Sequence, residues 1–137
     1  MRPALRAAAL TLLLTVVACS SSPGALGRAE STGILTVGAV DSPPAVVPGE
    51  GGEVTGGLAD AITGYAESIG AEPTWQVGEP DALAAAAERG EIDVVIGIPA
   101  DQVPDGMTVA AERDGASALV TDDEEALRDS MAEHLGG

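Results

Sequence analysis

Short runs of apolar residues alternate along this chain with apolar positions at helical spacing. Residues 34–40 and 92–98 are rich in Ile, Leu and Val, which is typical of strands that are buried inside a sheet. Apolar side chains recur every three or four positions over 58–69, which predicts an amphipathic helix. A second helix is predicted over 80–89, because proline occupies its first turn, alanine fills its body and glycine follows its end.

The remaining segments complete an alternation of strands and helices. Residues 73–77 predict a weak strand, and two more strands, 107–111 and 116–120, flank an Asp-Gly pair. Thr121 and Glu124 have the spacing of a capping box, which predicts a final helix after them. This order of elements predicts an α/β fold in which helices flank an open, mainly parallel sheet.

The N-terminal residues have the pattern of a bacterial export signal. Two arginines precede an uncharged apolar stretch of about 11 residues, roughly half of a membrane span. The sequence Val-Val-Ala-Cys at 16–19 resembles the bacterial lipobox. That resemblance implies a signal peptide over 1–18 and a lipid on Cys19, which would anchor the protein to the membrane. The alternative is an ordinary secretory signal with an incidental cysteine.

The charge of the chain limits its partners. It has 22 acidic and 6 basic residues, with a formal net charge of −16. Removal of residues 1–18 takes two arginines away and lowers this to −18. Such a surface repels nucleic acid and anionic headgroups, so we expect no nucleic-acid partner and a membrane attachment through the lipid alone. Residues 20–31 are small and polar, which predicts a tether within a lipidated segment 19–32.

The sequence contains no motif for enzymatic chemistry. It lacks G-x-S-x-G, the P-loop, H-E-x-x-H and any pair of cysteines, and His134 has no partner group implied by the sequence. We therefore expect neither an enzyme nor a metal or cofactor. The acidic residues 122–125 fit a solvated helix start better than a calcium site. Trp75 and Tyr65 are expected to be packing residues.

Four segments between Gly33 and Gly97 together resemble a known family. They are Gly-Ile-Leu-Thr-Val-Gly at 33–38, Asp-Ser-Pro-Pro at 41–44, the Gly, Asp and Gly at 56, 60 and 70, and Arg-Gly-Glu-Ile-Asp-Val-Val-Ile-Gly at 89–97. In this order they are similar to the first strand, ligand loop, first helix and third strand of the family 3 extracellular solute-binding proteins of ABC transporters.

The resemblance implies one lobe of a periplasmic-binding-protein type 2 fold over residues 33–137. These proteins have two lobes, and the segment 99–121 is too short to hold the second. The implied ligand-binding residues are Asp41, Ser42, Pro44 and Gly97. Asp41 fits a turn residue before two prolines slightly better than it fits a ligand contact.

The chain departs from the family pattern at two ligand positions. Ala45 stands where the family has an aromatic residue, and 99–106 lacks the arginine that pairs with an amino-acid carboxylate. We therefore expect weak or partner-dependent binding of a small polar solute at the outer face of the cytoplasmic membrane. An ABC permease or a separate second-lobe protein would be the partner. The alternatives are an envelope adaptor without a ligand and a truncated product.

Overall fold

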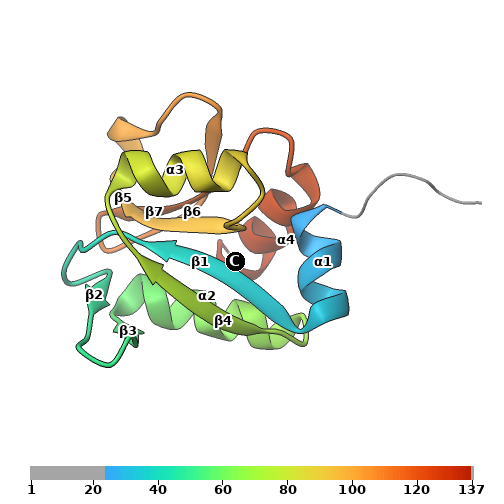
Figure 1. Cartoon of the computed structure of the whole chain (residues 1–137), viewed down its shortest axis with the longest axis horizontal. Helices are drawn as coiled ribbons and strands as arrows, with labels where there is room; N and C mark the ends of the chain where they lie inside the picture. Colours follow the sequence, from blue (N-terminus) through green and yellow to red (C-terminus); the bar gives the residue numbers. More distant parts are fainter. Residues whose placement is uncertain (1–23, 137) are drawn as a thin grey trace, which may run out of the picture.

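The apolar runs form the strands of one five-stranded sheet in the computed structural model, which describes residues 24–136 (Figure 1). The predicted signal peptide and Cys19 lie outside these residues. The helices are α1 (Ala25–Thr32), α2 (Gly57–Ser68), α3 (Pro80–Glu88) and α4 (Glu125–Leu135), with a 3-10 turn, η1 (Ala100–Gln102). The strands are β1 (Ile34–Ala39), β4 (Glu72–Val77), β5 (Val94–Ile98), β6 (Met107–Arg113) and β7 (Ala116–Thr121), with a small hairpin of β2 (Val47–Pro48) and β3 (Val54–Thr55).

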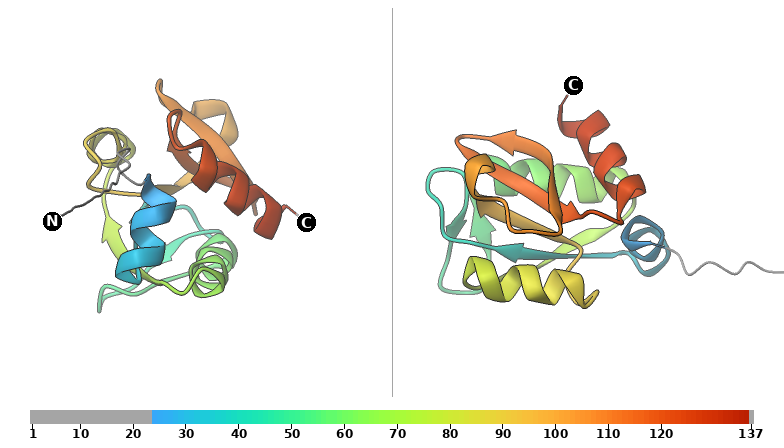
Figure 2. Two further views of the ribbon diagram at one scale, coloured as in Figure 1. Left: turned by 90° about the vertical axis from the view of Figure 1, so that its right-hand side faces the viewer. Right: turned by 90° about the horizontal axis from the view of Figure 1, so that it is seen from above.

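The sheet has the strand order β4-β1-β5-β7-β6. Strand β1 pairs in parallel with both β4 and β5, whereas β7 is antiparallel to both of its neighbours. Strand β6 therefore points the same way as β5, and β7 alone is reversed. This confirms the expected open, mainly parallel sheet. Figure 2 shows α2 and α4 on one face of the sheet and α3 on the other.

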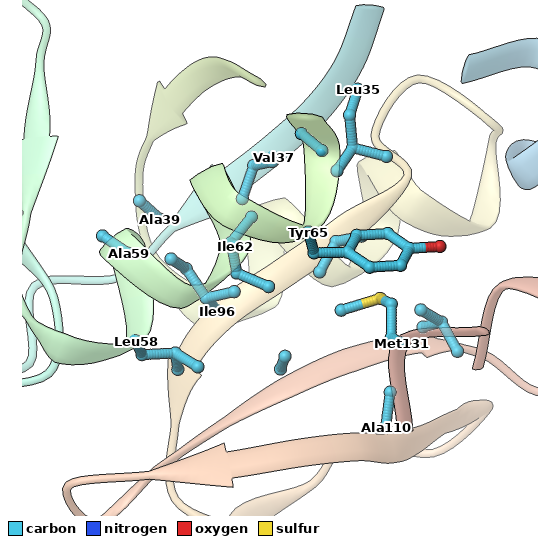
Figure 3. Packing of buried hydrophobic residues seen from close by; sticks show 14 of the residues in the cluster. Leu35, Val37, Ala39, Leu58, Ala59, Ile62, Tyr65, Ile96, Ala110 and Met131 are labelled. Carbon is cyan, nitrogen blue, oxygen red and sulfur yellow. The ribbon is translucent and has the colours of Figure 1, made fainter. Parts of the chain in front are cut away.

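Strand β5 is buried on both faces, as its continuous apolar sequence predicts. Val94 and Ile96 pack with the side chains of α2 and α4, while Val95 and Ile98 pack with those of α3. The larger core cluster includes Tyr65, whose ring lies beside Met131 of α4 in Figure 3. The expectation that Tyr65 is a packing residue is confirmed, since its side chain is fully buried.

The prediction of a tether is wrong for residues 25–32, which form helix α1. Ala25 and Ala29 are buried in the larger core cluster, because their small side chains let the helix approach its neighbours closely. The N–H of Ala25 donates to Glu124 Oε1 at 3.0 Å. Arg28 Nη2 donates to Asp93 Oδ1 at 3.3 Å. These long-range contacts hold α1 against the lobe.

The predicted capping box is also wrong. Helix α4 begins at Glu125, and no side chain caps its first turn. Thr121 Oγ1 instead donates to Asp123 Oδ1 at 2.7 Å, and Glu124 accepts from Ala25 of helix α1. Of the acidic residues 122–125, Glu125 is the one within the first turn. The helix itself follows from its apolar positions, two of which, Leu127 and Met131, are buried.

Candidate functional site

The carboxyl ends of β1 and β5 meet at one edge of the sheet, because these strands are parallel neighbours. A hollow of about 470 Å³ lies there. One wall is the segment 40–42 after β1, a second is the first turn of α3 and a third is the segment from Gly97 to Pro104. Open α/β sheets bind ligands at this edge, in the crevice outside the carboxyl ends of their strands. The hollow is therefore the candidate site.

Three of the four residues implied by the resemblance line this hollow. They are Asp41, Ser42 and Gly97, which come from two segments far apart in the sequence. Ser42 exchanges two backbone hydrogen bonds with Val46, both of 2.9 Å, and these fix the turn after β1. Pro44 is not among the lining residues that the structure describes. Its carbonyl oxygen accepts the N–H of Gly57 at 3.3 Å instead.

Gly97 shapes the hollow through its backbone. Its φ angle is +106°, a region that residues with a Cβ rarely adopt. A Cβ at this position would collide with the carbonyl oxygen of Val40. The pairing register of β5 with β7 shifts between Ile96 and Ile98, so Gly97 lies at an irregularity of the strand. Glycine is therefore needed where β5 reaches the site.

Asp81 and Gln102 also line the hollow, although no sequence motif indicated them. Asp81 lies in the first turn of α3, and α3 begins at this edge because it follows the parallel strand β4. An acidic residue in a first turn also stabilises the helix dipole, so its sequence position alone did not indicate a site. Both Asp41 and Asp81 are exposed to solvent. No Arg, Lys or His is present among the described residues that line the hollow.

The departures from the family pattern have clear structural counterparts. Ala45 is fully buried, and its carbonyl oxygen accepts the N–H groups of Leu58 and Ala59 at the start of α2. Arg113, the first arginine after the segment 99–106, donates from its Nη2 to the carbonyl oxygen of Leu135 at 3.4 Å. Neither Ala45 nor Arg113 lines the hollow. The aromatic ring and the carboxylate-pairing arginine of the family pattern are therefore not supplied at this hollow by Ala45 or Arg113.

A second, larger hollow of about 670 Å³ lies between the start of α1, the end of α3 and the loop from β7 to α4. Its arginines already have carboxylate partners: Arg28 pairs with Asp93, and Arg89 contacts Glu91 at 2.9 Å. The hydrogen bonds from Arg89, and then its charge, lower the pKa of the Glu91 carboxyl. This hollow contains none of the residues implied by the resemblance and lies away from the carboxyl ends of β1 and β5. We therefore place the candidate site at the smaller hollow.

Neither a metal-binding cluster nor a membrane-spanning helix is found in residues 24–136. No group of three or more His, Cys, Asp or Glu residues there is arranged to hold a metal ion. None of the helices in this range is long and apolar enough to cross a membrane.

No protein-family model and no curated protein matches the chain. Solved structures do. The arginine-bound form of domain 1 from TmArgBP is 20% identical, with a TM-score of 0.65, and the match covers 80% of this chain and 96% of that domain. A point mutant of the same arginine-bound domain is 21% identical, with a TM-score of 0.67 and coverages of 82% and 96%.

A truncated, arginine-bound ArgBP from T. maritima is 28% identical, with a TM-score of 0.46, and the match covers 50% of this chain and 33% of that one. The domain 1 structures match over nearly their whole length. At 20–21% sequence identity, this likeness shows the fold. The chain therefore has the fold of a single lobe of a periplasmic-binding-protein type 2 protein.

Proposed function

We propose that this protein is a single-lobe solute-binding protein of the cell envelope. The hollow at the carboxyl ends of β1 and β5 would hold one side of a small polar solute. The observation that supports this most is the meeting of Asp41, Ser42 and Gly97 in that hollow. The comparison with TmArgBP adds support, because domain 1 of that protein was solved in an arginine-bound form. One lobe of this fold can thus carry a ligand in that protein.

The affinity of such a site is expected to be low. Good small-molecule sites bury about 70–90% of the surface of their ligand, whereas a single lobe offers a wall on one side. A partner that closes over the hollow would supply the other wall. We propose an ABC permease or a separate second-lobe protein in this role, so that the chain acts within an uptake system.

The proposed location follows from the lipobox-like sequence. A lipid on Cys19 would anchor the chain to the outer face of the cytoplasmic membrane. Helix α1 begins at Ala25, so the chain between Cys19 and this helix would span at most about 20 Å if fully extended. The lobe would thus stay close to the membrane surface, where a permease is within its reach.

A thermal-shift screen tests the proposed function. Full-length protein in detergent micelles is heated with and without small polar solutes at about 10 mM. A ligand with a dissociation constant of about 1 mM stabilises the folded state by about 1.4 kcal/mol at that concentration, which raises the Tm of a domain of this size by several degrees. No shift with any solute in the screen would contradict the proposal and favour an adaptor without a ligand.

Two variants show where on the protein the ligand that raises the Tm is bound. Gln102→Trp places a large ring in the wall of the hollow, and we expect it to abolish the ligand-induced shift. Gln76→Trp makes the same change at an exposed position of β4 that does not line the hollow, and the shift should remain. A shift that survives Gln102→Trp would place the ligand elsewhere.

A further inference from the structure

The charges around the hollow select among polar solutes. Asp41 contributes a carboxylate from the segment after β1, and Asp81 contributes another from the first turn of α3. These residues belong to different walls of the hollow. No basic side chain is present among the described lining residues. An anionic group on a ligand would therefore meet two like charges and find no counter-charge there.

A buried hydroxyl lies on β7 opposite a residue that lines the hollow. Ser117 is opposite Ile98 in the antiparallel pair of β5 and β7, so both side chains project from the same face of the sheet. Ile98 lines the hollow. The Ser117 Oγ is fully buried and has no hydrogen-bond partner among the described residues. Ser117 is not itself among the described residues that line the hollow, so the contacts to a ligand are assigned to Asp41 and Asp81.

We propose that the hollow binds a small organic cation that carries ammonium or guanidinium groups and no carboxylate. This inference rests on the proposed function and names its ligand class. Asp41 and Asp81 would accept charge-assisted hydrogen bonds from the cationic groups, which are stronger than neutral ones. The strongly negative net charge of the chain, −16, would further favour the approach of a cation. Asp81 is then a specificity-determining residue.

Agmatine and L-arginine form the decisive pair of ligands, because they differ by the carboxylate that agmatine lacks. Isothermal titration of full-length protein in detergent micelles, at low ionic strength, compares their dissociation constants. We expect agmatine to bind at least tenfold more tightly. Low ionic strength matters because salt screens the exposed carboxylates. L-Arginine binding as tightly as agmatine would overturn this inference and leave the proposed function standing.

Asparagine variants test the two carboxylates, since they keep the shape of aspartate and remove its charge. Asp41→Asn and Asp81→Asn are each expected to weaken agmatine binding about threefold to fivefold, the upper range for exposed ion pairs. Asp101→Asn is the control, because Asp101 is exposed in η1 and does not line the hollow. Its effect should stay below about twofold, the limit expected for a change in net charge alone.

The remaining outcomes separate the two claims. An Asp101→Asn variant that weakens agmatine binding as much as Asp81→Asn would overturn the assignment of Asp81. The affinity would then depend on the net charge of the protein and not on the position of the carboxylate. Failure of agmatine to bind, while a neutral or anionic solute from the thermal-shift screen does, would overturn the ligand class alone. Failure of every solute would overturn the proposed function together with this inference.

Discussion

Replacing the buried Val95 by aspartate is expected to unfold the lobe. Val95 is fully buried in the middle of β5, where it pairs with Gly38 of β1 and Leu119 of β7. Its side chain packs under α3 with the smaller core cluster. The substitution removes a buried valine side chain, worth about 1.5–3 kcal/mol, and leaves a carboxylate without a partner, which costs several kcal/mol more.

The sum of these two terms is close to the whole stability of a small domain, about 5–15 kcal/mol. The variant should therefore lose most of its folded population at neutral pH. Burial would raise the pKa of the new carboxyl above its unfolded value, so the folded state would bind more protons than the unfolded state. The difference in the free energy of unfolding between the variant and the parent protein should then shrink as pH falls from 7 toward 4.

The matched control is Val77→Asp, the same substitution at a strand valine whose side chain is 51% exposed. Its expected effect on stability is below about 1 kcal/mol, as for most surface substitutions. Circular dichroism during heating measures both variants beside the parent protein. A Val95→Asp variant that keeps the parent Tm would refute the placement of Val95 in the core.

Three further predictions concern the site, its shape and the anchor. Gly97→Ala should lower the Tm by several degrees, because its Cβ collides with the Val40 carbonyl oxygen; Gly64→Ala in α2, where space is open, should not lower it. Cys19→Ser should release the protein from the membrane fraction of a bacterial host, and unchanged fractionation would contradict lipidation. Isothermal titration should show no free amino acid bound more tightly than about 1 mM, since no charge-assisted partner for its carboxylate lines the hollow; a micromolar amino acid would contradict this.

The elements with strong local patterns were predictable from the sequence. The continuous apolar run of β5 and the helical spacing of α2 follow from periods that the residues themselves carry. Helix α1 was not predictable in this way, because its small residues also suit a linker. Its docking depends on Glu124, which accepts the N–H of Ala25 from 99 positions away. Contacts at that separation leave no local pattern.

The residues of the site were likewise predictable only in part from the sequence. The resemblance indicated Asp41, Ser42 and Gly97, and the structure brings these residues to one hollow. Pro44 is absent from that lining because the turn directs its carbonyl toward the start of α2. Asp81 was missed because an acidic residue in a first helical turn is common for reasons of the helix dipole alone. Only the placement of the start of α3 beside the carboxyl ends of β1 and β5 brings Asp81 to the hollow.

The most direct test of the proposed function is a nitrogen–proton NMR titration of the full-length protein with the solute that gives the largest thermal shift. Saturable shifts of the amides of Asp41, Gly97 and Gln102 are predicted, because these residues line the hollow. The amides of Arg28 and Glu124, at the larger hollow, should stay unchanged. Saturable shifts confined to the larger hollow, or no saturable shift at all, would contradict the account.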